Sequence, residues 1–370
     1  MRRIAAPIIL LLLCWGSAGC ITLNKRSIDH DFGGLRGAMA RSHIVSLLLV
    51  HGMGGYSAGD PDALVAGFQS QLHLRSNGPE VSVTVPDGVG ALSGIVSRQD
   101  FSDDAGRTLR IYKLQWEPLT EPLKKEYLAY DDDPAVTKLR LPIHNQLKQS
   151  LMNTNVPDVV LYSGEYKTVL RHSVKWTLER MQKDLHNDSD YEFFFVTFSL
   201  GSKIVFDVVD EMDTEAERSS RDAIVDRTAS FFMLANQIPL LGLGEVKPTS
   251  MPSTADGGPG YQSMLSFVQR KRSRMNPAQK TAQTQPSRSD LTIVAVSDPN
   301  DLFSYTIPPY VRDRSPSIFI NVVMSVAKTG YWIPGEGYVA SPLEAHTGYG
   351  HDPDVIKLII DGGKANRKAP

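Results

Sequence analysis

Ser199 is the residue whose sequence context best fits nucleophilic chemistry. The apolar run from Phe193 to Phe198 ends directly before it and predicts a buried strand, and the amphipathic segment from Lys203 to Met212 predicts a helix. A serine on a sharp turn between a strand and a helix is held in strained geometry that presents its hydroxyl above the sheet. We therefore expect Ser199 to act as a nucleophile.

A second candidate element is the glycine-rich segment His51-Gly52-Met53-Gly54-Gly55, which follows the apolar run from Ile44 to Val50. Glycine lets the backbone turn so that an N–H can point at a developing oxyanion. We expect Gly52 to line the substrate site. Asn236 and Gln237 follow another predicted strand, Phe231 to Ala235, and we expect them to line the same pocket.

Together, Ser199 and the glycine-rich segment make the chain resemble the α/β-hydrolases, whose lipases and esterases carry a His-Gly-x-Gly loop after a strand. Gly201 matches the small residue that this family needs after the serine, whereas Thr197 stands where glycine is usual. The resemblance covers roughly Ile44 to Ile360 and implies a strand–turn–helix nucleophile elbow at Ser199.

The same resemblance implies an oxyanion hole formed by the backbone N–H groups of Met53 and Leu200, with His51 as a structural residue. It also implies a catalytic acid and a base downstream of the serine, in that order along the chain. Asp298 and Asp301 both follow the predicted strand Leu291 to Val296.

Asp301 is the preferred acid because Leu302 and the Pro308-Pro309 region resemble the apolar segment that follows the acid loop in this family. Asp298 is the alternative acid, although an Asx turn at the end of the strand would also explain it.

Only His346 and His351 come late enough to supply the base. His346 precedes Val355 by nine residues, which leaves room for a loop that carries it over the serine. His351 lies against the start of the last predicted helix at Pro353 and fits a surface or capping residue better. We therefore expect a triad of Ser199, Asp301 and His346.

The alternation of apolar strands with helices predicts an α/β protein, specifically an α/β-hydrolase fold: a mostly parallel sheet with helices on both faces and two surface insertions. A continuous apolar run such as Ile44 to Val50 is typical of a strand buried on both faces. The expected organisation is a signal peptide (1–19), a polar tether (20–42), a hydrolase domain (43–362) with insertions near 119–157 and 242–290, and a frayed tail (363–370).

The beginning of the chain has the pattern of an export signal. Arg2 and Arg3 precede the apolar run Ile8 to Trp15, and the small residues Ser17-Ala18-Gly19 lead to Cys20. This tail resembles the lipobox of bacterial lipoproteins, except that Ser17 stands where leucine is usual. We expect Cys20 to be lipidated and the protein to be anchored in the bacterial cell envelope; the alternative is an ordinary cleaved signal with an incidental cysteine.

Composition excludes several other classes of function. The 39 basic and 41 acidic side chains give a net charge of −2, so no surplus of positive charge exists to bind nucleic acid. Both cysteines lie in the first twenty residues, which removes cysteine-based metal sites from the rest of the chain. Phosphate-binding and zinc-protease motifs do not occur, and we expect neither a cofactor nor a metal.

The function that these observations favour is a serine hydrolase that cleaves carboxylic esters through an acyl-enzyme. The expected lipid at Cys20 and the apolar Leu240-Leu241 favour a lipid or acyl ester as the substrate. Two alternatives stay open: a non-catalytic lipoprotein that uses the same fold for binding or scaffolding, and a serine peptidase on that fold.

Overall fold

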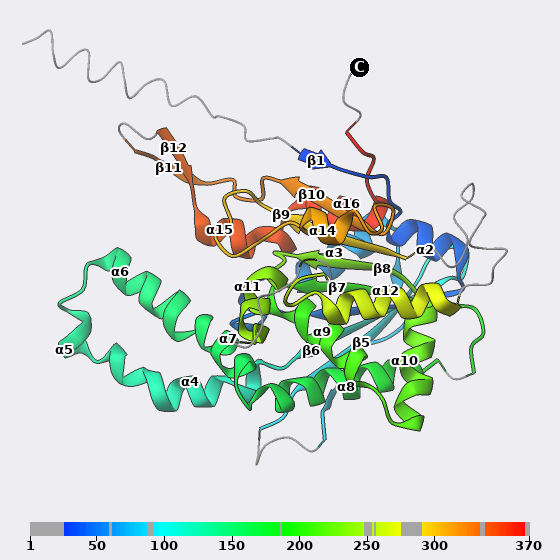
Figure 1. Cartoon of the computed structure of the whole chain (residues 1–370), viewed down its shortest axis with the longest axis horizontal. Helices are drawn as coiled ribbons and strands as arrows, with labels where there is room; N and C mark the ends of the chain where they lie inside the picture. The colour runs from blue at the N-terminus through cyan, green and yellow to red at the C-terminus, as the bar shows by residue number, and fades with distance from the viewer. Residues whose placement is uncertain are drawn as a thin grey trace, which may run out of the picture.

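The computed structural model describes residues 26–58, 61–86, 92–185, 187–247, 254, 257–274, 291–333 and 337–366. A ten-stranded sheet in the order β1-β10-β9-β8-β7-β2-β6-β5-β3, with β4 paired to β5, runs through its centre (Figure 1). The strands from β10 to β6 in this order are parallel to one another, and those outside them at both ends are joined by antiparallel pairing. The parallel strands are β2 (Ile44–Val50), β6 (Thr108–Gln115), β7 (Tyr191–Phe198), β8 (Thr228–Leu234), β9 (Thr292–Ser297) and β10 (Phe319–Met324); the others are β1 (Arg26–Ile28), β3 (Arg75–Ser76), β4 (Val81–Thr84) and β5 (Ile95–Ser102).

Helices cover both faces of this sheet, because its central strands are apolar on both sides. In β2, Leu48 and Val50 face one hydrophobic core while Leu47 and Leu49 face the other. The first core is closed by α8 (Lys167–Lys183), α9 (Leu200–Glu211), α10 (Glu215–Arg227) and α12 (Gln262–Arg274), and the second by α2 (Leu35–Arg41), α3 (Pro61–Gln71) and α16 (Pro353–Asp361). The prediction of an α/β fold with a mostly parallel sheet is confirmed.

A helical excursion leaves the sheet after β6 and returns before α8. We call residues 117–163 the arm. It extends well beyond the body of the protein (Figure 1), at the place where an insertion near 119–157 was expected. Its elements are η2 (Glu117–Leu119), α4 (Glu121–Leu128), η3 (Ala129–Asp132), α5 (Pro134–Thr137), α6 (Pro142–Leu147), the π-helical turn η4 (Lys148–Asn153) and α7 (Val156–Ser163).

The shorter elements lie mostly at the carboxyl ends of the strands. They are η1 (Gly55–Ala58), α11 (Ile238–Gly242), η5 (Leu243–Glu245), α14 (Pro309–Arg312), α15 (Pro342–Thr347), η7 (Gly348–Gly350) and a separate antiparallel pair, β11 (Gly330–Ile333) with β12 (Gly337–Ala340).

The predicted tether and tail differ from the structure. From Arg26 onward the segment expected to be a polar tether belongs to the fold, because β1 pairs with β10 and α2 buries Leu35 and Met39. The tail is held as well: Gly363 bridges to Phe32, and the backbone N–H of Asn366 donates to the carbonyl of Ile28. The predicted signal peptide (1–19) and Cys20 lie outside the described residues.

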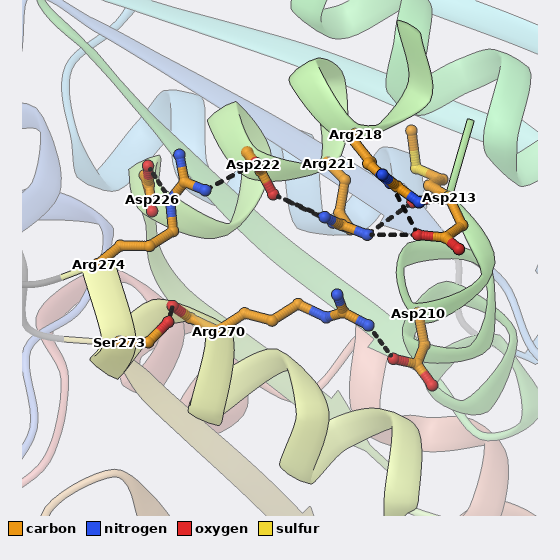
Figure 2. Close-up of polar contacts among 10 residues, drawn as sticks. Asp210, Asp213, Arg218, Arg221, Asp222, Asp226, Arg270, Ser273 and Arg274 are labelled. Carbon is orange, nitrogen blue, oxygen red and sulfur yellow. Dashed lines mark hydrogen bonds and ion pairs between the residues drawn. The ribbon is translucent and has the colours of Figure 1, made fainter. Parts of the chain in front are cut away.

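The expectation of a surface insertion near 242–290 is also wrong in part, because α12 packs into the core through Met264 and Phe267. Figure 2 shows how the basic residues of α12 are used. Arg270 donates to Asp210 of α9, and Arg274 donates to Asp222 and Asp226 of α10. Arg270 and Arg274 thus fasten α12 to its neighbours on the first face of the sheet. Nearer the start of α10, Arg218 and Arg221 pair with Asp213.

Within the described part of the chain, no helix combines the length and the apolar character needed to cross a bilayer.

Candidate active site

The loops expected to carry chemistry meet where the chain changes direction within the sheet. From β2 the chain goes on to β6 on one side, whereas β7, on the other side of β2, is followed outward by β8, β9 and β10. Loops at such a switch point leave the carboxyl edge in opposite directions and open a crevice between them, where ligands bind in open α/β sheets. The segments after β2 and β7 begin at His51 and Ser199, so both lie at the edge where this topology places such a crevice.

Ser199 occupies a strained turn between β7 and α9. Its backbone has φ 50° and ψ −120°, a conformation that costs a non-glycine residue on the order of 1–3 kcal/mol. Its N–H donates to the carbonyl of Leu234 at 2.7 Å, which holds the turn against the end of β8. Its Oγ is buried and has no hydrogen-bond partner within the described chain. The strained turn therefore carries a hydroxyl that forms no hydrogen bond with another described residue.

Close backbone contacts explain the small residues around this turn. A Cβ on Gly52 would lie 2.6 Å from the Cβ of Ser199, and one on Gly201 would lie 2.6 Å from the carbonyl oxygen of His51. Thr197 fits where glycine was expected because its hydroxyl donates to the carbonyl of Phe232 at 3.1 Å. The two loops are thus in direct contact at the site.

His51 stabilises the loop after β2. Its Nδ1 donates to the carbonyl of Gly52 at 2.8 Å, and its Nε2 accepts from the N–H groups of Trp116 at 3.0 Å and Glu117 at 3.3 Å. The ring also stacks on Trp116. Burial lowers the pKa of His51 to about 3, so the imidazole is neutral, as this bonding pattern requires. With both nitrogens engaged, it is not available as a base.

A buried ion pair from the arm fixes the same loop. The carboxylate of Asp158 accepts the N–H of Gly54 at 2.7 Å and contacts the Nζ of Lys124 at 3.1 and 3.2 Å. Burial raises the pKa of Asp158, and the ammonium of Lys124 opposes that rise. Gly54 has φ 71°, and a Cβ there would meet the Oδ1 of Asn155 at 1.7 Å. The conformation of the loop therefore depends on both its glycines and the arm.

The two backbone N–H groups expected to form the oxyanion hole belong to the loop after β2 and to the start of α9. Met53 lies in the loop after β2, and Leu200 is the first residue of α9, where helix geometry leaves the N–H without an intrahelical acceptor. Among the described residues, no hydrogen bond takes the N–H of either residue. The positive end of the α9 dipole adds to the attraction for negative charge beside Ser199.

His346 and Asp301 form a buried pair. The Nδ1 of His346 lies 2.9 and 3.0 Å from the two carboxylate oxygens of Asp301, whose side chain is fully buried. Asp301 also accepts the N–H of Phe303 at 2.9 Å and the hydroxyl of Tyr349 at 3.2 Å. An Nδ1–H that donates to the carboxylate leaves Nε2 with a free lone pair, which is the tautomer a general base needs.

Asp298 has a different set of partners. One of its oxygens accepts the N–H groups of Val326 and Ala327 at 2.6 and 2.9 Å, and the other accepts from Asn300. It ties the loop after β9 to the segment after β10. Of the two candidate acids, the structure places Asp301, and not Asp298, against His346.

His346 lies on a helix rather than in the loop expected for it. It belongs to α15, which packs against η1, the turn that continues the glycine-rich loop. The described chain shows no hydrogen bond between His346 and the Oγ of Ser199. In enzymes without bound substrate such hydrogen bonds are often long and tighten in the substrate complex. The alternative base, His351, is exposed in the segment between η7 and α16.

The two predicted pocket residues after β8 differ in their bonding. Both polar atoms of Asn236 are used by the backbone, since Nδ2 donates to the carbonyl of Tyr305 and Oδ1 accepts from the N–H of Ile238. The amide of Gln237 is fully buried and has no hydrogen-bond partner in the described chain. Asn236 therefore shapes the loop, whereas the amide of Gln237 bonds no other described residue.

Two contributors to this site were not expected from the sequence: Asp158, which holds Gly54, and Tyr349, which bonds Asp301. The hydroxyl of Tyr349 also accepts the N–H of Asp298 at 2.7 Å, so it joins the two acidic residues. Neither residue lies in a motif that predicts its role.

No group of three or more histidine, cysteine or acidic side chains that could hold a metal lies among the described residues.

Neither the known protein-family models nor the curated proteins include a match to this chain.

Proposed function

We propose that this protein is a serine hydrolase of the α/β-hydrolase class that cleaves carboxylic esters through an acyl-enzyme. The observation that carries the proposal is the unpartnered, buried Oγ of Ser199 on a strained strand-to-helix turn. A buried His346–Asp301 pair lies on elements at the same edge of the sheet. The order of serine, acid and base along the chain agrees with this class.

In the proposed reaction, Ser199 attacks the ester carbonyl while Nε2 of His346 takes the proton from its hydroxyl. Asp301 holds the imidazole in the required tautomer and stabilises the imidazolium that forms. The N–H groups of Met53 and Leu200 stabilise the oxyanion. The imidazolium then protonates the leaving alcohol, and water activated by His346 releases the acid from Ser199.

We further propose that the substrate is a lipid or acyl ester and that the protein is held in the bacterial envelope by a lipid on Cys20. Exposed apolar side chains near the site, including Leu240 and Leu302, support the choice of an apolar ester. The buried amide of Gln237, three residues beyond Leu234 of β8, is the group we assign to a polar part of that substrate.

The test is covalent labelling with a fluorophosphonate probe, together with hydrolysis of short p-nitrophenyl esters. Ser199→Ala should abolish labelling and lower kcat by roughly 10⁴–10⁶. Ser273→Ala is the matched control, because Ser273 lies far along α12 and only bonds the carbonyl of Arg270; its rates should equal those of the parent. If the parent is not labelled, the non-catalytic alternative replaces the hydrolase. If Ser199→Ala retains activity within tenfold, the nucleophile is a different residue.

A further inference from the structure

The arm carries an unusual amount of exposed apolar surface. Leu139 is 88% exposed, Tyr130 77% and Leu141 62%, although each has enough apolar area to favour burial. Between α4 and η4 the described side chains supply almost no core of their own, since Lys124 is the one that is buried. Soluble proteins rarely leave apolar side chains gathered like this unless they contact a partner.

Other exposed apolar side chains follow strands at the carboxyl edge of the sheet. Leu240 and Leu243 follow β8, Leu302 follows β9, and Val339 lies on β12; all are exposed. In Figure 1 the arm and the β11–β12 pair both extend from the side of the sheet at which β1 begins. We call these residues, with those of the arm, the apolar rim. Leu240, Leu243 and Leu302 of the apolar rim lie at the same edge of the sheet as Ser199.

The register of β1 shows where the chain enters this structure. Arg26 pairs with Met324, the last residue of β10, and β10 runs parallel to β9. Arg26 therefore lies at the carboxyl edge of the sheet, on the same side as the apolar rim. From Cys20 to Arg26 is six residues, and six residues of fully extended chain span at most roughly 20 Å.

We propose that the apolar rim is a membrane-contacting surface, which seats the candidate active site against the bilayer that holds the lipid of Cys20. Because the connection between Cys20 and Arg26 is short, a lipid on Cys20 keeps the carboxyl edge close to the bilayer. The bilayer is therefore the apolar partner that we assign to the rim. The inference rests on the proposed hydrolase and on the proposed lipid at Cys20. It adds the orientation of the protein on the membrane: the carboxyl edge of the sheet, with Ser199, faces the bilayer, and the amino edge faces away from it.

The test measures the depth of single labels on the full-length protein, processed in bacteria and reconstituted into phosphatidylcholine–phosphatidylglycerol vesicles. Beyond Cys20 the chain has no cysteine, so Leu139→Cys and Leu243→Cys each introduce a unique thiol for an environment-sensitive fluorophore. Asp104→Cys is the control, since Asp104 is exposed in the turn before β6, at the amino edge. We expect blue-shifted emission and quenching by brominated lipids at 139 and 243, and neither at 104.

Three results would overturn the proposal. One is equal water exposure of the labels at 139 and 104. Another is blue-shifted emission at 139 without quenching by lipid, which would assign the rim to a second copy of the chain. The third is an unmodified Cys20 in a protein that stays out of the vesicles. Fluorophosphonate labelling of the same samples reports on the hydrolase separately, so failure of the orientation and failure of the proposed function are distinguishable.

Discussion

Removing the carboxylate of Asp158 should damage catalysis and stability by separable routes. In Asp158→Ala the buried ammonium of Lys124 loses its counter-ion and keeps only the carbonyl of Thr154, at 3.0 Å. Leaving one partner of a buried pair uncompensated costs about 3–5 kcal/mol, and total stability is about 5–15 kcal/mol, so we expect a folded but weakened protein. The hydrogen bond from the N–H of Gly54 to this carboxylate is lost as well.

The catalytic loss follows from the position of Gly54, directly after the candidate oxyanion donor Met53. Misplacing one such donor lowers kcat by about 10²–10³, and we expect Asp158→Ala to fall in this range on p-nitrophenyl esters. The double variant Lys124→Met, Asp158→Leu replaces the pair by apolar side chains, which is often neutral for stability. It should recover the free energy of unfolding in urea but not the rate.

The matched control is Glu121→Ala, which breaks the exposed pair with Lys125 in the same arm. Exposed pairs contribute about 0–1 kcal/mol, so stability and kcat should both stay close to those of the parent. A double variant whose kcat lies within about threefold of the parent value would refute the reasoning, because it would show that Asp158 acts on stability alone.

Two further predictions concern titratable side chains of the site. Asp301→Asn should lower kcat by about 10³–10⁴ because the imidazole loses its orienting partner. Asp298→Asn should mainly lower the unfolding free energy. If Asp298→Asn lowered kcat more than Asp301→Asn, Asp298 would be the acid. The fold lowers the pKa of His51 from 6.5 to about 3. As the pH falls below 6.5, His51 therefore binds a proton in the unfolded chain but not in the folded protein. This lowers the free energy of unfolding, by about 1.4 kcal/mol at pH 5.5. His51→Gln should remove that part of the pH dependence in urea titrations between pH 7 and 5, and an unchanged slope would contradict the assignment.

The central strands could be predicted from the sequence because burial on both faces requires unbroken apolar runs. The prediction for Ile44 to Val50 coincides with β2, and the run to Phe198 ends where β7 ends. The strand β5 has no such run, since Asp100 on its surface pairs with Arg98 of the same strand and with Arg110 of β6. Strands near the edge of a sheet are stabilised by such cross-strand and solvent contacts, which leave a weaker pattern in the sequence.

Two helices were missed although their signal was present. Leu35, Ala38 and Met39 have the spacing of one helix face, and Met264, Phe267 and Val268 repeat it in α12. Both lie in stretches whose average composition is polar, which predicted a tether and a surface insertion. Local periodicity, rather than average composition, was the informative property in both cases.

The features of the site are of two kinds: local ones, and contacts between residues far apart along the chain. The strained turn at Ser199 is a local feature, since the strand before it and the helix after it suffice to predict it. Asp158 acts on Gly54 across 104 residues, and nothing in the sequence between them indicates that pairing. Tyr349 acts on Asp301 across 48 residues and likewise carries no pattern of its own.

This difference changes the status of the arm. By sequence the arm is an insertion outside the sheet, and most of its side chains contribute nothing to either core. Its two ends, however, supply the buried Lys124 and Asp158 that fix the loop beside Ser199, and its hydroxyl of Tyr162 donates to Asp207 on α9, the helix that begins after that serine. Helix α7, which bonds the glycine-rich loop through Asp158 and helix α9 through Tyr162, is therefore part of the site's framework. Deleting the arm would therefore remove the hydrogen bonds that hold the glycine-rich loop and α9 in place.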